Sequence, residues 1–268
     1  MTESCSTRFP VLLLHGLAYR DDMRYVASWG RIPSRLAATG CSVFLGELEA
    51  WGSIEENAAA LCNRIDAIKA QTGAGKVNLI GHSKGGLEAR YAVSRLGVAD
   101  RVASLTTIST PHHGTYVADL ANALSPCDLI PQGVALDLLA RLMGDRDPQS
   151  LTCLRELTRA SMTRFNAEVP DVPSVYYQSF GTVMKRMTDD PIFALSFEML
   201  RLHDGENDGM VPAASCRWTN FRGIIPTRIA AQGISHLEIT DFRQKDMAGV
   251  DIPALYADIV RDLKDRGF

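Results

Sequence analysis

Ser83 has the type and the surroundings of a nucleophile in a tight strand-to-helix turn. It stands in the segment GHSKGG at 81–86, which directly follows the apolar run VNLI at 77–80. So sharp a turn leaves room only for glycine-sized neighbours two residues before and two residues after the serine. Apolar residues at helical spacing over 86–96 predict the helix that must follow. The pattern predicts attack of the Ser83 hydroxyl on a carbonyl carbon.

A serine hydroxyl is a poor nucleophile near neutral pH, so it needs a histidine to accept its proton and a carboxylate to orient that histidine. In turns of this kind the order along the chain is serine, acid, histidine. Asp208 and His236 follow Ser83 in that order, and we predict these three residues as catalytic. Taken alone, Asp208 fits a turn and His236 fits a surface loop. Three other carboxylates remain alternatives for the acid: Asp204, Glu206 and Asp241.

Two backbone amides are predicted to stabilise the oxyanion that forms during such an attack. One is the N–H of Lys84, at the start of the helix after the serine. The other lies near the N-terminus, where the apolar run 10–14 ends in HGL at 15–17. A donor from an early strand-to-helix loop is expected there, which places the Leu17 amide by position. An ordinary tight turn is the alternative for this loop.

The chain resembles the bacterial true lipases of the Pseudomonas and Burkholderia type, within the α/β-hydrolases. The segments that match this family occur in the same order along the chain: 10–17, 32–36 with Gly40, 76–83, 107–115, 207–211 and 236–238. It implies a lipase or esterase that cleaves acyl esters, acylglycerols among them, through Ser83, Asp208 and His236. It also implies an oxyanion hole of the Leu17 and Lys84 amides.

Two departures from the family pattern bear on the site. The family commonly has glutamine or histidine after the nucleophile, where this chain has Lys84, whose side chain would pair with a carboxylate or add a cation beside the acyl site. Family members often hold a structural calcium ion at positions that fall at Asp189, Asp190 and Glu238. Carboxylate oxygens suit calcium, but 189–191 also fits a turn or a helix cap. The chemistry itself requires no cofactor.

The elements that must position these residues alternate between strands and helices. Core strands are predicted at 10–14, 42–45, 77–80, 102–108, 175–180 and 224–230. Ser53 and Glu56 form a capping box that begins a helix, and 252–263 has the pattern of an amphipathic helix. Repeated strand and helix units predict a mostly parallel sheet with helices on both faces. We therefore expect an α/β-hydrolase fold in a single domain over 1–268.

The segment 117–165 interrupts this alternation with many leucines among prolines and glycines. It is predicted to be a helical insertion, either a lid that opens toward lipid or a fixed cap. A lid would make transient contact with a lipid interface, and either form would build an apolar acyl pocket. His112 and His113 are interpreted as structural, because no acidic or cysteine partner stands at ligand spacing.

Composition excludes several other classes of protein. The net charge of −3 gives no electrostatic basis for nucleic-acid binding, and no apolar run reaches the roughly eighteen residues that span a bilayer. Six cysteines without metal spacing predict free thiols, although the resemblance implies a disulfide near Cys216. The N-terminus lacks the pattern of a secretory signal, which predicts a cytoplasmic protein; export with a removed signal is the alternative.

Three other functions remain open from the sequence. An acyltransferase would use the same acyl-enzyme and pass the acyl group to an alcohol or thiol. A polyester depolymerase would share the three catalytic residues but need an open cleft. A binding module on this scaffold would be expected to have lost one of the three residues, and all three are present. The oligomeric state is not predicted.

Overall fold

The computed structural model describes residues 4–18, 20, 21, 28–123, 137, 138, 140, 141 and 144–268. Within these residues, parallel strands form one sheet in the order β2-β1-β3-β4-β5-β6. The strands span β1 Val11–Leu14, β2 Val43–Leu45, β3 Val77–His82, β4 Val102–Ile108, β5 Tyr176–Gly181 and β6 Phe221–Ile224. Because all these pairs are parallel, the carboxyl ends of the strands meet at one edge of the sheet.

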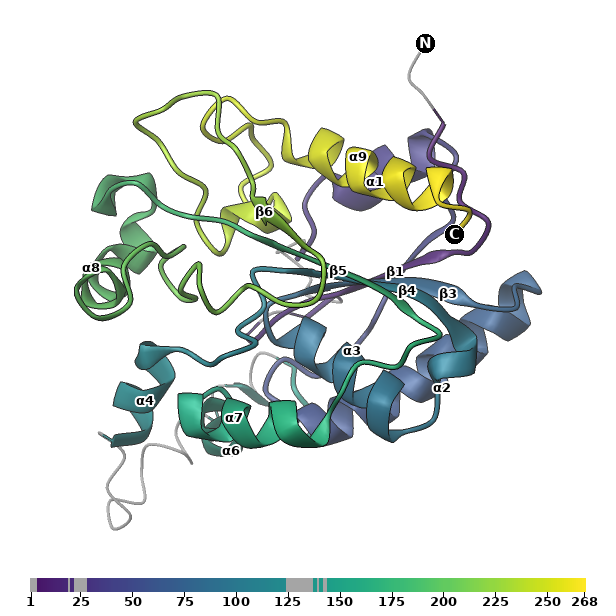
Figure 1. Cartoon of the computed structure of the whole chain (residues 1–268), viewed down its shortest axis with the longest axis horizontal. Helices are drawn as coiled ribbons and strands as arrows, with labels where there is room; N and C mark the ends of the chain where they lie inside the picture. Colours follow the sequence, from purple (N-terminus) through teal and green to yellow (C-terminus); the bar gives the residue numbers. More distant parts are fainter. Residues whose placement is uncertain (1–3, 19, 22–27, 124–136, 139, 142–143) are drawn as a thin grey trace.

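Helices cover both faces of this sheet (Figure 1). Helices α1 and α9 lie over one face, and α2 and α3 lie over the other. The helices span α1 Ile32–Ala38, α2 Ile54–Thr72, α3 Lys84–Arg95, α4 Tyr116–Ala123, α6 Ser150–Glu156, α7 Arg159–Glu168, α8 Ala194–His203 and α9 Ile252–Asp265. Short 3₁₀ turns span η1 Ala99–Arg101, η2 Met187–Asp189, η3 Pro191–Phe193 and η4 Glu238–Thr240.

The side chains of strand β1 show why helices must cover both faces of the sheet. Its four side chains are all buried, and they alternate between the two faces. Val11 and Leu13 join the core under α1 and α9, whereas Leu12 and Leu14 join the core under α2 and α3. A strand buried on both faces is apolar at every position, as this one is. The predicted α/β-hydrolase fold with a mostly parallel sheet is confirmed.

The strands predicted before residue 181 agree with the structure to within one or two residues, but the sixth is misplaced. Strand β6 ends at Ile224, so the prediction of a strand at 224–230 is wrong. The amide of Ile225 still donates to the carbonyl of Gly181 at 2.8 Å, and Pro226 follows. Proline has no N–H to continue the hydrogen bonds between the strands, so the pairing of β6 with β5 ends before Pro226.

Helix α2 begins as predicted. The Ser53 hydroxyl accepts a hydrogen bond from the Glu56 amide at 3.2 Å, and the Glu56 carboxylate accepts from the Ser53 backbone amide at 3.4 Å. The predicted capping box is thereby confirmed. Helix α9 likewise covers the predicted amphipathic segment, beginning at Ile252 with Asp251 as its N-cap.

The predicted insertion at 117–165 is described in part. Helices α6 and α7 of this segment pack on the α2 and α3 side of the molecule, where Leu157 and Met162 join a small core with Ile54 and Leu87. Residues 124–136, 139, 142 and 143 of the segment lie outside the described residues. A moving lid therefore stays a prediction.

The cysteines of the described segments carry free thiols. They are Cys5, Cys41, Cys62, Cys153 and Cys216. Cys216, for which the family resemblance implied a disulfide, is fully buried, and burial raises the pKa of its thiol well above the usual value. Cys127 lies outside the described residues. In the same part of the chain, helices that combine the length and apolarity needed to cross a bilayer are not found.

Candidate active site

Ser83 lies at the turn between β3 and α3 with a strained backbone. Its φ is 54° and its ψ is −129°, a region that side chains other than glycine rarely adopt. A Cβ atom on Gly81 would lie 2.6 Å from the Gly86 nitrogen, and one on Gly85 would lie 2.4 Å from the His15 carbonyl oxygen. The glycines therefore let strand, helix and the loop after β1 approach closely enough to form the nucleophile turn.

The structure brings together the three residues predicted as catalytic. The Ser83 hydroxyl lies 2.9 Å from Nε2 of His236, and Nδ1 of His236 lies 2.8 Å from Oδ2 of Asp208. With the Nδ1 proton donated to Asp208, Nε2 is the acceptor for the serine proton. The arrangement can therefore generate an alkoxide-like serine and hold the positive charge that then develops on the imidazole.

The Asp208 carboxylate is fully buried and held from several sides. One oxygen accepts hydrogen bonds from the amides of Met210 at 3.0 Å and Val211 at 2.8 Å. The oxygen that faces His236 also accepts from the Thr182 hydroxyl at 3.3 Å. In addition, the carbonyl of Asp208 accepts from the amide of His236 at 2.8 Å. Backbone and side chain together fix the distance between the acid and the histidine.

The three alternative acids have other surroundings. Asp204 and Asp241 are each paired with an arginine, at 2.6 and 2.7 Å. The side chain of Glu206 is 72% exposed. Among the carboxylates that the structure describes, Asp208 is the one that contacts the imidazole of His236.

The two predicted oxyanion donors flank Ser83. A Cβ atom on Gly16 would lie 2.6 Å from the Cβ of Ser83, so the loop that contains Gly16 and Leu17 touches the nucleophile. Lys84 is the first residue of α3. Within the described residues, neither the Leu17 nor the Lys84 amide donates to a protein acceptor. Both remain predicted donors to a substrate oxygen.

His82 is a neighbour of His236 to which the sequence assigned no role. The centroids of the two rings lie 4.6 Å apart, and the Trp29 indole meets the His82 ring edge to face with 6.4 Å between centroids. Burial lowers the pKa of His82 well below its usual value, and the charge of His236 acts in the same direction. The lowered pKa favours the neutral form of His82, whose ring packs against that of His236. The feature of the sequence that could have indicated this contact is that His82 directly precedes Ser83.

The Lys84 side chain is fully buried, and it pairs with a carboxylate. Its ammonium group donates to Glu88, one turn later on α3, and the Asn57 amide donates to the same carboxylate at 2.7 Å. Of the two predicted roles of this side chain, the structure shows the ion pair. Burial acts to lower the pKa of Lys84, but Cys153 and Glu88 outweigh it and hold the pKa above its usual range.

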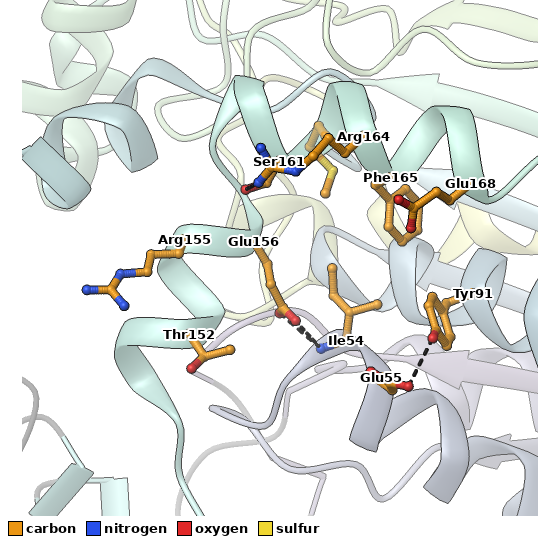
Figure 2. Close-up of a pocket in the computed structure, with 11 residues that line it drawn as sticks. Ile54, Glu55, Tyr91, Thr152, Arg155, Glu156, Ser161, Arg164, Phe165 and Glu168 are labelled. Atoms are coloured by element: carbon orange, nitrogen blue, oxygen red, sulfur yellow. Dashed lines mark hydrogen bonds between the residues drawn. The ribbon is translucent and has the colours of Figure 1, made fainter.

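A second carboxylate, Glu156, lies near this pair. Figure 2 shows its side chain pointing toward the amide of Ile54, at 3.0 Å, in a cavity of about 410 Å³ between α2, α3, α6 and α7. Burial raises the pKa of Glu156 to about 7, although the charge of Lys84 and the Ile54 N–H act against this shift. We call Lys84, Glu88, Asn57 and Glu156 the Lys84 cluster.

Two of the three positions predicted as calcium ligands, Asp190 and Glu238, contact a guanidinium instead. Arg243 donates to Asp190 at 2.9 and 3.3 Å and also donates to Glu238. The Asp189 carboxylate accepts from the amides of Gly233 at 2.9 Å and Lys185 at 2.7 Å. A calcium ion requires six to eight oxygen ligands, and groups of acidic, histidine or cysteine side chains placed to hold a metal are not found among the described residues. This donor set does not fit calcium.

We call Arg243, Asp190 and Glu238 the Arg243 cluster; the sequence reasoning missed its arginine. Burial acts to raise the pKa of Asp190, but hydrogen bonds from Arg243 and Ser235 outweigh it, so this pKa lies below its usual value. Burial raises the pKa of Glu238, with Arg243 acting against the shift. A basic residue seven positions after His236 was the only signal in the sequence.

His112 has the contacts expected of a structural residue. Its Nε2 lies 3.0 Å from the Thr107 hydroxyl, and its Nδ1 lies 3.2 Å from the guanidinium of Arg90. The indole of Trp218 stacks on the ring at 5.2 Å. Burial lowers the pKa of His112 well below its usual value. The His112 ring thus links Thr107 on β4 to Arg90 on α3 and to Trp218.

Comparison with known proteins relates this arrangement to lipases and esterases. The α/β-hydrolase fold family matches residues 10–131. A triacylglycerol lipase of Vibrio cholerae is 35% identical over 62% of this chain, which there spans 55% of the relative's length. Among solved structures, a metagenomic carboxyl esterase superposes over 98% of this chain and 78% of its own with a TM-score of 0.75 and 19% identity. The mature lipase of Bacillus licheniformis superposes over 97% of this chain and 95% of its own, with a TM-score of 0.69 and 20% identity.

These structural matches establish the fold, and a more similar sequence establishes the family. A triacylglycerol lipase of Pseudomonas fragi is 32% identical over 79% of this chain and 82% of its own length. The chain belongs to the bacterial triacylglycerol lipase family of the α/β-hydrolases.

Proposed function

We propose that this protein is a serine carboxylester hydrolase that cleaves acyl esters, acylglycerols among them, through an acyl-enzyme on Ser83. The observation that carries the proposal is the continuous chain of hydrogen bonds from Ser83 through His236 to Asp208, with distances of 2.9 and 2.8 Å. The names of the related lipases support the class of substrate. The proposal assigns the catalytic roles that the sequence predicted.

In the first half of the reaction, His236 accepts the Ser83 proton at Nε2 while the serine oxygen attacks the ester carbonyl carbon. Asp208 holds the imidazole in the tautomer that leaves Nε2 free, and it stabilises the imidazolium. The amides of Leu17 and Lys84 donate to the oxyanion. The carbon–oxygen bond to the alcohol then breaks, and His236 gives its proton to the leaving oxygen.

In the second half, water takes the place of the alcohol. His236 removes a proton from this water, whose oxygen attacks the acyl carbon bound to Ser83. The tetrahedral intermediate breaks the bond to the serine oxygen, and His236 returns the proton to Ser83. The carboxylic acid leaves, and the enzyme has its starting protonation. All groups that act in these reaction steps belong to the protein, the substrate or water.

The proposal extends to a lipid interface, which exposed apolar side chains on and before α8 would contact beside the predicted insertion. Six apolar side chains of the described chain are large and exposed: Leu138, Met187, Ile192, Leu195, Leu202 and Ile229. Leu195 and Leu202 lie on α8, where they are 75% and 74% exposed. Exposed apolar side chains of this size support contact with an acyl or lipid surface.

The test is hydrolysis of p-nitrophenyl acetate, butyrate, octanoate and palmitate by the wild type and by Ser83→Ala. Loss of the nucleophile is expected to lower kcat by about 10⁴-fold or more, because the remaining residues cannot form the acyl-enzyme. Ser34→Ala, which changes an exposed serine on α1, is the matched control and retains the activity. The chain-length profile separates an esterase from a lipase.

A wild type that hydrolyses none of these esters would contradict the proposal. So would a Ser83→Ala variant with undiminished turnover. Addition of a competing alcohol distinguishes hydrolysis from acyl transfer: a hydrolase releases mainly free acid, whereas an acyltransferase forms the new ester as its main product.

A further inference from the structure

A partly buried guanidinium, that of Arg243, lies beside the loop that carries the proposed catalytic histidine. Arg243 contacts both oxygens of Asp190, at 2.9 and 3.3 Å, and one oxygen of Glu238. The side chains of Asp190 and Glu238 are 0% exposed, and that of Arg243 is 27% exposed. Two desolvated carboxylates thus share one arginine, whose planar guanidinium group can donate to both at once.

The same carboxylates hold the histidine loop on both sides of His236. Asp190 accepts from the Ser235 hydroxyl at 2.7 Å, and the Ser235 oxygen accepts from the Glu238 amide at 3.2 Å. Ser235 and Glu238 flank His236 along the chain. A closed ring of hydrogen bonds therefore runs from Asp190 through Ser235 and Glu238 to Arg243 and back to Asp190.

The neighbouring residue, Asp189, secures the start of the loop. Its carboxylate accepts from the Gly233 amide at 2.9 Å. A Cβ atom on Gly233 would lie 2.2 Å from the Val183 carbonyl oxygen, so this backbone packs tightly against the segment that follows β5. The histidine loop is thus fixed to the 189–190 segment at Gly233, Ser235 and Glu238.

We infer that Arg243 is a positioning residue that supplies, within the chain, the cation that holds Asp190 and Glu238 together and so orients His236. It occupies the place in which the family resemblance predicted a calcium ion. The inference concerns orientation of the proposed catalytic histidine and therefore rests on the proposed function. In this protein, the Arg243 side chain takes the structural role that a bound divalent cation would have.

The experiment compares the wild type with Arg243→Ala, with and without guanidinium ion at millimolar concentration. In Arg243→Ala the two buried carboxylates lack a counter-ion, so the melting temperature is expected to fall by about 10 °C. Because the variant misplaces His236 and leaves the substrate contacts in place, kcat is expected to fall by about 10²-fold with KM unchanged. Guanidinium ion is expected to restore part of both losses, since it refills the space between the carboxylates.

Two further measurements test the replacement of calcium. Neither EDTA nor added calcium is expected to change the melting temperature of the wild type. Arg35→Ala is the matched control, because Arg35 pairs with Asp251 at 3.2 Å with both side chains 42% exposed, far from the histidine loop in the chain. This variant is expected to retain the wild-type melting temperature and kcat.

Three results would overturn the inference: wild-type kcat in Arg243→Ala, a loss of melting temperature without a loss of kcat, or a wild type destabilised by EDTA. If Arg243→Ala does not fold, Arg243→Lys decides the question, because it keeps the charge and loses the fork. It is expected to lower kcat by about tenfold, and unchanged kcat would contradict the role. If the wild type hydrolyses no ester, the proposed function fails separately, and the melting temperatures still decide whether Arg243 replaces calcium.

Discussion

Two ion clusters lie next to residues of the proposed active site, and the pKa values of their carboxylates shift in different ways. In the Arg243 cluster, one arginine contacts both Asp190 and Glu238 directly. In the Lys84 cluster, the ammonium group contacts Glu88, whereas Glu156 is bonded to the Ile54 amide. The first cluster lies beside the histidine and the second beside the serine.

The difference shows what it takes to offset burial: several direct donors lower the pKa of Asp190, whereas Glu238, with Arg243 alone, keeps a raised pKa, as Glu156 does. Asp190 receives Arg243, Ser235 and the Ile192 amide, and its pKa lies below the usual value in spite of burial. Glu156 is near Lys84 without contacting it, and burial raises its pKa to about 7. The Arg243–Asp190 contact of the first cluster is therefore an ion pair, while the Lys84 cluster contains Glu156, with a pKa of about 7.

The largest expected effect comes from removing the cation of the Lys84 cluster. Lys84→Met leaves Glu88 buried without its counter-ion, and we expect the free energy of unfolding to fall by about 3–5 kcal/mol. The loss should exceed that in Arg243→Ala, because the Lys84 side chain is 1% exposed and that of Arg243 is 27% exposed, so water compensates less. Urea denaturation at pH 8 measures both.

The double variant Lys84→Met/Glu88→Gln is the control for this prediction. It removes the unpaired charge together with the cation, so most of the lost stability is expected to return. A double variant as unstable as Lys84→Met would indicate that packing of the lysine stem, and not its charge, supports the start of α3.

Most of the fold was predictable because its signals are local. The alternation of buried strands with helices indicated the sheet, and Ser53 with Glu56 marked the start of α2. The misplaced strand β6 shows the limit of this approach. Residues 224–230 are rich in β-branched residues, but Pro226 lacks the N–H for the ladder, and the strand lies earlier, at 221–224.

The three residues predicted as catalytic come together because their order and glycine neighbours reflect one turn geometry. Arg243 and Glu156 were not predictable in the same way. Their partners lie 53 and 102 residues away along the chain, at Asp190 and Ile54, and a spacing that long carries no periodic signal. Such contacts follow from the tertiary fold, so the sequence showed the acids without showing what neutralises them.

Asp190→Asn tests whether the Arg243–Asp190 contact is an ion pair. Because the folded pKa of Asp190 is lowered, its ionised form stabilises the protein above the unfolded value and loses that effect as pH falls through the folded pKa. We therefore expect the variant to lose about 3 kcal/mol at pH 7, with a loss that shrinks toward acid pH. Unfolding free energies measured from pH 3 to pH 7 check this, and a loss independent of pH would contradict the ionic role.

Glu156→Gln tests the opposite behaviour in the Lys84 cluster and should have the smallest effect. The folded pKa of Glu156, about 7, lies above its ordinary value, so the folded state binds the extra proton between pH 4.5 and 7. The stability contributed by this group is present at acid pH and is lost as pH rises to 7. A neutral glutamine can still accept from Ile54, so the variant should gain about 2 kcal/mol at pH 8 and nothing at pH 5. Equal changes at the two pH values would show that Glu156 is ionised throughout, and the contrast between the two clusters would then disappear.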